Sequence, residues 1–265
     1  MSVNNRFKNA AKWQKAACAV LSIFVFLLIW HFGTNGTDLG KILPGPIEVI
    51  QKFFLSFAEP IGTQTILGHI LWSLSRVLTG FLIAAVLGVT LGVTMGWYPL
   101  VEAIFKPIIE IVRPIPPIAW IPLAILWFGL GETTKYFLIF LAAFCIITIN
   151  AYDGAKSVDP VLVGAAKMLG ANDRRIFTSI VLPASAPYIF AGLQVALGTA
   201  WATVVAAEMV RSSEGVGWTI ISAQDSNNSL QILVGILAVG IVGFVLAIIM
   251  RTLEARVCSW SERGK

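Results

Sequence analysis

The sequence predicts an all-α integral membrane protein that crosses the bilayer six times. Hydrophobic residues make up 57% of the 265 residues and charged residues only 12%, whereas a soluble domain carries about 25% charged residues. The mean hydropathy is +0.82, and a globular core of this size could not hide that much apolar surface from water. The net charge of +5 does not require a nucleic-acid partner, because basic residues concentrated on cytoplasmic loops give the same total.

Six apolar runs are long enough to be membrane helices, each of which needs about 20 residues. They cover residues 16–33, 72–97, 114–131, 136–152, 184–207 and 232–250. The first run follows a polar stretch and is not followed by a small-residue cleavage site, so we expect it to be retained. The last three runs carry no charge. The six runs predict one membrane domain over residues 1–265.

The second and third runs contain residues that shape a helix. Gly88, Gly92 and Gly96 lie four residues apart in the second run, a spacing that permits close helix packing. The third run holds four prolines at positions 114, 116, 117 and 122. Each proline removes a backbone donor and kinks a helix, so the third crossing is predicted to be broken.

The charged residues between the runs predict the orientation. Segment 34–69 reads as a Pro-Gly turn and a short amphipathic helix on the outer membrane surface. With six crossings both termini lie on one side, and 13 of the 19 Lys and Arg residues then fall on that side. Four fall on the other side, namely Lys41, Lys52, Lys135 and Arg211. The positive-inside rule therefore predicts cytoplasmic N- and C-termini.

A polar segment, residues 157–183, separates the fourth and fifth runs. Asp159 and Pro160 are a typical helix start, and Gly170 is a typical stop. Asn172 begins a second short helix, and Pro183 is predicted to end it. The segment is either an ordinary solvated cytoplasmic loop or a docking element, since a short amphipathic helix can lie in the groove of another protein.

The spacing of residues in this segment resembles a known family. It is similar to the "EAA" loop of ABC-type importer permeases at Gly164, Ala165, Ala166, Gly170, Ile180, Leu182 and Pro183. Gly164 stands where the namesake motif has an acidic residue, which puts a salt bridge in doubt there. The resemblance implies a coupling helix that sits in a cleft of a cytoplasmic ATPase.

The resemblance extends over about residues 66–250. "RPIPPIAWIPLAILWFGLGETTKYFLI", "WATVVAAEMV" and "GVGW" resemble the nitrate/sulfonate/taurine/bicarbonate branch of these permeases, and taurine permeases most of all. It implies a type I ABC importer permease fold in the bacterial cytoplasmic (inner) membrane. It also implies a homodimer in lipid, two copies of a separate ATPase, and an extracytoplasmic solute-binding protein.

No cofactor is expected in this chain, and ATP and Mg are expected on the partner ATPase. A phosphate-binding loop has Gly, four residues, then Gly-Lys-Ser/Thr. The most similar stretch, "GTDLGKI", is one residue short and lacks the final Ser or Thr. The three cysteines and two histidines are not spaced as a metal site. We therefore expect the chain itself not to be an enzyme.

Five residues are candidates for the transport path: Arg113, Pro114, Pro117, Trp120 and Glu208. A charge beside an apolar span tends to face a cavity, so Arg113 could attract an anion. Glu102, Lys106 and Glu110 share its helix face, and we interpret these three residues as lying at the membrane interface. Transporters often place solute beside broken helices, although packing would explain the prolines and Trp120 equally. Glu208 could pair with Arg211, and the family has an acidic residue there.

The function that these observations favour is the permease subunit of an ATP-driven importer for a small organic anion, taurine or a related alkanesulfonate. Nitrate, bicarbonate or a vitamin precursor stay open as solutes. A secondary carrier or a membrane scaffold is the alternative from another class, and co-purification with an ATPase would separate them. An intramembrane protease needs a nucleophile and a base at membrane depth, and the runs offer no such set.

Overall fold

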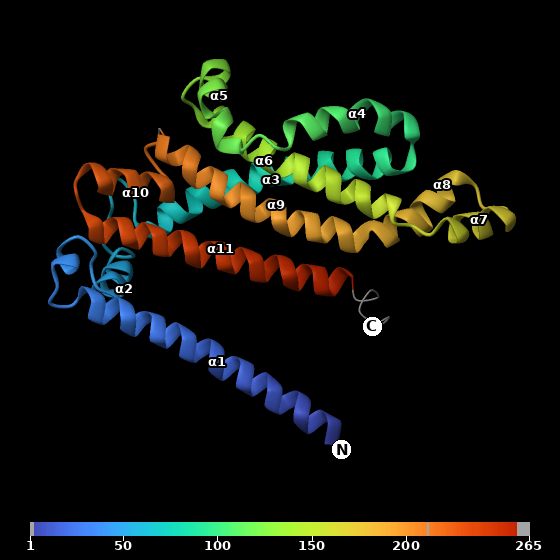
Figure 1. Ribbon diagram of the computed structural model, residues 1–265. Coiled ribbons are helices and arrows are strands. Elements are labelled where there is room, and N and C mark those ends of the chain that lie inside the picture. The colour runs from blue at the N-terminus through green and yellow to red at the C-terminus, as the bar shows by residue number, and fades with distance from the viewer. Residues whose placement is uncertain (1–2, 211, 259–265) are drawn as a thin grey trace.

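The computed structural model describes residues 3–210 and 212–258, and these residues fold into helices joined by short turns (Figure 1). The elements in chain order are α1 (Val3–Thr34), η1 (Asp38–Lys41), α2 (Pro46–Leu55), α3 (Ile66–Trp97), α4 (Pro99–Val112), η2 (Pro117–Trp120), α5 (Ile121–Phe128), α6 (Glu132–Lys156), α7 (Pro160–Met168), α8 (Asp173–Ile176), η3 (Phe177–Val181), α9 (Leu182–Val210), α10 (Val216–Asp225) and α11 (Ser229–Val257). The predicted all-α class is confirmed.

The centre of the molecule is a layer of three long helices, α3, α6 and α9, with α10 and α11 packed on α9. Their shared core consists of small and branched apolar side chains, among them Val77, Ala84, Ile139, Ala143, Ile147, Ala196, Ala200 and Val204. Helix α1 runs apart from this layer and reaches it mainly through η1 and α2. Its apolar surface is therefore left to lipid or to another protein.

Close packing of α3 against α6 depends on the glycines of α3. A Cβ atom at Gly92 would meet the carbonyl oxygen of Thr148 and the side chain of Ala151, and one at Gly96 would meet Ala155. A larger residue would push the two helices apart. The packing role predicted for these glycines is confirmed, and the partner helix is α6 of the same chain.

Five helices of the described chain are long and apolar enough to cross a membrane, with a sixth crossing only if α4 and the η2–α5 segment count as one. The predicted third span, 114–131, has the wrong bounds. Its helical part begins at Pro99, and the chain bends by 88° between α4 and the η2–α5 segment. Pro114, Pro116 and Pro117 lack the N–H groups that would continue α4. Helix α5 has eight residues, about 12 Å at 1.5 Å per residue, which is too short to span a bilayer.

The bundle has two distinct ends. Helices α7 and α8 project beyond one end, called here the α7 end, and the start of α1 and the end of α11 lie toward it (Figure 1). Helices α2 and α10 lie at the opposite end, the α10 end. The terminal helices thus point to the same side as the polar segment. That this side is cytoplasmic stays a prediction.

Candidate functional site

The polar segment at the α7 end folds as two short helices. Asp159 caps the first, since its Oδ1 accepts a hydrogen bond from the N–H of Val161 at 2.8 Å. Gly170 ends it with φ of +77°, a left-handed conformation that only glycine adopts readily. Asn172 then caps α8, with its Oδ1 accepting from the N–H of Arg175 at 2.9 Å. The starts predicted at Asp159 and Asn172 and the stop predicted at Gly170 are confirmed.

The predicted end of the second helix at Pro183 is wrong. Helix α8 passes through one π-turn, η3, directly into α9, and the stretch Asp173–Val210 is a single crossing of 38 residues. At the end of η3 the N–H of Leu182 bonds to the carbonyl of Phe177, five residues earlier. This wider turn shifts the hydrogen-bond register before the proline that follows, so the missing donor of Pro183 does not stop the helix.

Helix α7 exposes its apolar side chains. The exposed fractions are 74% for Val161, 57% for Leu162, 86% for Met168 and 88% for Leu169. No residue of α7 is buried, while Ala165 and Ala166 are half-buried. Several exposed apolar side chains on a polar, projecting loop are typical of a protein-docking site.

The base of this loop is fixed to the bundle. Ile176 and Val181 are buried, and the rings of Trp97 and Phe177 lie 6.0 Å apart, joining α3 to η3. Ile180 is half-buried, and Leu182 and Pro183 are exposed. The loop therefore has an exposed tip at α7 and a rigid base at α8 and η3.

The break between α4 and α5 gathers four of the five candidate path residues. Arg113 is the C-terminal cap of α4 and is exposed, Pro114 follows in the turn, Pro117 begins η2, and Trp120 ends it. The Nε1 atom of Trp120 is buried without a hydrogen-bond partner in the described chain.

The sequence predicted that the acidic and basic residues at the start of α4 form an interfacial face. In the structure they also bind residues of α6. Glu102 binds Lys156 at 2.8 Å and accepts a hydrogen bond from the hydroxyl of Tyr152 on α6. Lys106 donates to the same hydroxyl at 3.1 Å. These contacts fasten the beginning of α4 to the end of α6, which leads into the α7 loop.

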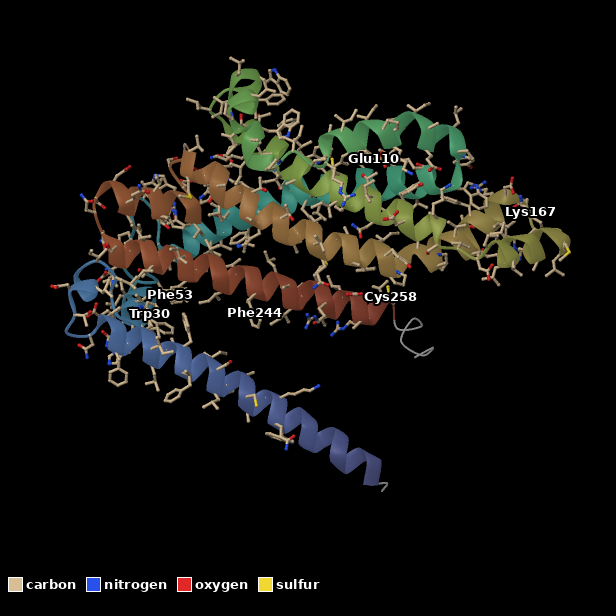
Figure 2. The ribbon with its side chains drawn as sticks, viewed as in Figure 1. Trp30, Phe53, Glu110, Lys167, Phe244 and Cys258 are labelled. Carbon is tan, nitrogen blue, oxygen red and sulfur yellow. The ribbon has the colours of Figure 1, made fainter. Side chains whose placement is uncertain are left out.

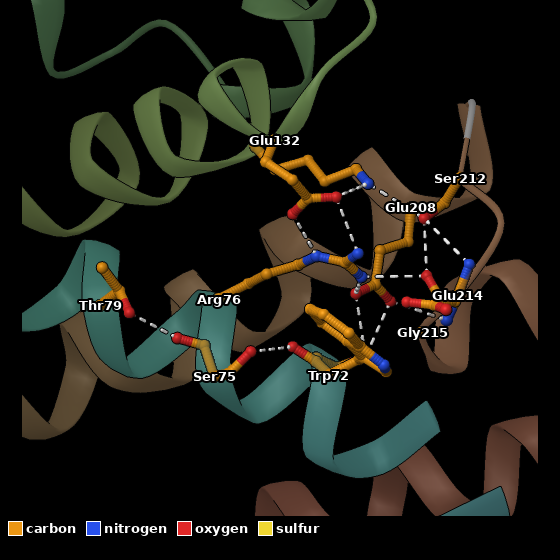
Figure 3. Close-up of polar contacts among 12 residues, drawn as sticks. Trp72, Ser75, Arg76, Thr79, Glu132, Glu208, Ser212, Glu214 and Gly215 are labelled. Carbon is orange, nitrogen blue, oxygen red and sulfur yellow. Dashed lines mark hydrogen bonds and ion pairs between the residues drawn. The ribbon is translucent and has the colours of Figure 1, made fainter. Parts of the chain in front are cut away.

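Glu208 lies in a buried ion network at the α10 end. Arg76 binds Glu132 through two nitrogens, at 2.6 and 2.8 Å, and Glu208 through Nη1 at 2.7 Å (Figure 3). Arg76 is 2% exposed and Glu208 is fully buried. Lys135 adds an ion pair to Glu132 at 2.8 Å. The network joins α3, α6 and α9.

The same network holds the start of α10. The three consecutive N–H groups of residues 215–217 donate to His69 Nδ1 at 3.1 Å, Ser73 Oγ at 2.9 Å and Glu208 Oε2 at 3.0 Å. The carbonyl oxygen of Glu214 accepts from Arg76 at 2.9 Å. Gly215 has φ of +112°, and a Cβ there would clash with the Glu208 carboxylate. The turn into α10 is therefore fixed by side chains from α3 and α9.

Sequence reasoning missed most of this network. Arg76 lies near the start of the second apolar run and received no role, and Glu208 was expected to pair with Arg211, which lies outside the described residues. The partner that the structure gives Glu208 is Arg76, 132 positions earlier. The available signal was Arg76 itself, because an arginine inside an apolar run needs a buried acid.

Known proteins match this fold and sequence. The family described as "Binding-protein-dependent transport system inner membrane component" matches residues 84–258. The chain belongs to this family. It is 35% identical to the taurine transport system permease protein of Escherichia coli, over 94% of this chain and 92% of that protein. It is 34% identical to the nitrate import permease protein of Synechocystis, over 89% and 87%.

A solved structure gives the same architecture. An inward-facing structure of the MetNI methionine ABC transporter aligns with a TM-score of 0.60, covering 70% of this chain and 92% of that chain at 18% identity. This likeness concerns the fold alone. The family and the relatives establish the chain as a multi-pass inner-membrane permease subunit of an ABC importer.

Proposed function

We propose that two copies of this permease form the path by which a small organic anion enters the cell, with taurine or a related alkanesulfonate as the solute. A separate cytoplasmic ATPase, in two copies, supplies the energy with its ATP and Mg. An extracytoplasmic solute-binding protein delivers the solute. The relatives support an anionic solute, because their names specify taurine transport and nitrate import.

The observation that carries the proposal is the exposed apolar tip of α7 on a rigid base. Burying such side chains against an ATPase groove would stabilise the complex by removing apolar surface from water. The docking contacts are assigned to α7 and its stop, and the base transmits the movement. The residues assigned to coupling are Gly164, Ala165, Ala166, Gly170, Ile180, Leu182 and Pro183.

The route of the movement follows the chain. When the ATPase dimer closes, α7 and α8 shift as one unit, and α8 continues without a stop through η3 into α9. Helix α6 ends beside the loop and is packed along α9. At the far end of α9, Glu208 holds the start of α10. A shift at the α7 end thus reaches the α10 end through one continuous helix, which suits alternating access.

The path itself is assigned to the broken crossing. Irregular backbone at membrane depth is tolerated where it is buried in protein or lines a water-filled cavity. Arg113, Pro114, Pro117 and Trp120 lie at this break, and Glu208 is assigned to the path from the network at the α10 end. Because the face of α4 and α5 is uncovered in a single chain, a second copy related by a two-fold axis would complete the path.

The test is Ala165→Glu, which places a charge on the docking surface. We expect loss of ATPase co-purification and of transport, with normal membrane insertion. Ala58→Glu is the matched control, because Ala58 is exposed at the α10 end. Unchanged ATPase association in Ala165→Glu would show that the docking assignment is wrong. Transport by the purified chain without any ATPase would instead support a secondary carrier.

The choice of solute has its own experiment. The solute-binding protein that works with this permease is purified, and its melting temperature is measured with taurine, alkanesulfonates, nitrate, bicarbonate and vitamin precursors. Ligand that binds the folded state raises the melting temperature. We expect the largest increase with taurine or a short alkanesulfonate; an increase with nitrate or bicarbonate alone would reassign the solute.

A further inference from the structure

Helix α4 carries two ionisable side chains at membrane depth, Glu110 and Arg113. Neither side chain forms a hydrogen bond or an ion pair with another described residue, and both are exposed. Two other sets of charges in the crossings have ionic partners at the two ends of the bundle, namely the Arg76–Glu208 network and the Glu102–Lys156 pair. The two free charges on α4 therefore need another explanation.

Both residues lie near the middle of the bundle rather than at an end. Ile109, the residue before Glu110, packs in one cluster with Met95 and Cys145. Cys145 is about midway along α6 (Glu132–Lys156). Figure 2 shows Glu110 on α4 between the two ends of the bundle.

Lipid does not explain an exposed carboxylate and guanidinium at this depth. Insertion scales give about 2.5–3.5 kcal/mol for one charged residue at the centre of a membrane helix, and such residues face the bundle interior or a water-filled cavity. Glu110 and Arg113 are three residues apart and share a helix face, with Cβ atoms about 5–6 Å apart. One positive and one negative group are thus presented side by side.

The break in α4 adds a second negative element beside Glu110. Pro114 and Pro117 have no N–H, so the carbonyl groups of Glu110 and Arg113, four residues before them, lose their usual helical donors, whereas the carbonyl of Val112 accepts from the N–H of Ile115 at 3.1 Å. These carbonyls lie at the C-terminal end of α4, where the helix dipole is negative. A cationic group near Glu110 would be favoured by both, whereas a solute with only negative charge would be repelled there and attracted only by Arg113.

We propose that Glu110 and Arg113 form a binding site for a small zwitterionic solute, with Arg113 contacting its anionic group and Glu110 its ammonium group. The inference rests on the proposed function and narrows its solute to an amino-substituted anion such as an aminosulfonate. It assigns Glu110, which the path described above leaves out, as the residue that discriminates an aminosulfonate from a plain alkanesulfonate or nitrate.

The experiment measures solute binding by the assembled permease and ATPase in lipid nanodiscs. The solute-binding protein is left out, so any preference between solutes comes from the permease itself. Radiolabelled taurine is the probe, and ethanesulfonate, which lacks the amine, is the competitor. We expect taurine to bind about tenfold or more tightly than ethanesulfonate, since a hydrogen bond to a charged group is worth at least about tenfold in affinity.

The variants separate the two contacts. Glu110→Gln is expected to weaken taurine binding about tenfold and to leave ethanesulfonate unchanged or tighter, whereas Arg113→Gln weakens both. Glu59→Gln is the control, because Glu59 is an exposed carboxylate at the α10 end, paired only with Lys52 among the described residues. It should change neither affinity.

Three results would overturn the proposal. One is equal weakening of both solutes, or of neither, in Glu110→Gln. Another is absence of saturable taurine binding to the complex. The third is unchanged binding of both solutes in Arg113→Gln, which would mean that Arg113 does not contact the anionic group. Transport and ATPase coupling of the wild-type complex test the proposed function separately, so either idea can fail alone.

Discussion

Replacing Arg76 by methionine tests whether the buried network holds the α10 end together. The substitution keeps an unbranched side chain but removes the only described cation that contacts both Glu132 and Glu208, at 2.6 and 2.7 Å. Glu208 is fully buried, so its carboxylate would lose an ion pair that water cannot replace. Removing one partner of a buried ion pair costs about 3–5 kcal/mol of unfolding free energy.

A matched control exists in the same chain. Lys52 forms an ion pair with Glu59 at 2.6 Å, but their side chains are 30% and 56% exposed, and such exposed pairs contribute about 0–1 kcal/mol. Lys52→Met should therefore have little effect. The measurement is the unfolding free energy of each purified variant in mixed detergent micelles, followed by helical circular dichroism.

A double-mutant cycle makes the test sharper. When Glu208 is also changed to glutamine, the buried carboxylate that Arg76→Met leaves unpaired is removed, so the loss in the double variant should be clearly smaller than the sum of the two single losses. If Arg76→Met destabilises the protein no more than Lys52→Met does, the buried network is not what fixes the turn into α10.

Four further substitutions have expected outcomes. Gly92→Ala should destabilise the fold by about 1–3 kcal/mol through overpacking, since its Cβ would meet Thr148. Gly198→Ala should be neutral or stabilising, because nothing lies within 4 Å of the added Cβ atom. If Gly92→Ala and Gly198→Ala have equal unfolding free energies, the packing explanation for Gly92 is wrong. Gly170→Ala places alanine at φ of +77°, about 1–2 kcal/mol of strain, and should lower ATP hydrolysis stimulated by the loaded binding protein, whereas unchanged stimulation would mean that this turn does not matter. Trp201→Phe removes the indole donor to the Val239 carbonyl at 3.0 Å and should lower the unfolding free energy by about 1 kcal/mol, a loss that thermal denaturation would detect.

Helix α9 connects the α7 loop with the Arg76–Glu208 network. The helix that begins beside the α7 loop ends at the network, so the proposed docking surface and the turn into α10 are attached to opposite ends of one element. The π-turn at η3 lies between the loop and the body of this helix. Such turns are often found at functional sites, and this one sits where movement of the loop would enter the bundle.

Local properties of the chain were enough to predict several features. Composition and apolar runs predicted a helical membrane protein, because every backbone polar group in lipid must bond within its own segment. Asp159, Gly170 and Asn172 predicted the ends of the loop helices, because caps and stops act over three or four residues. The family also followed from residues close together in the sequence.

The tertiary structure decided what depends on distant partners. Arg76 pairs with Glu132 and Glu208, which come from two other helices. His69 and Ser73 accept hydrogen bonds from the start of α10, again across elements. Sequence order does not encode which charge another will meet. The bend after α4 and the uninterrupted passage through Pro183 likewise depend on how each proline's missing donor is accommodated. Only the folded backbone, in which a missing hydrogen bond is either replaced or left open, determines that outcome.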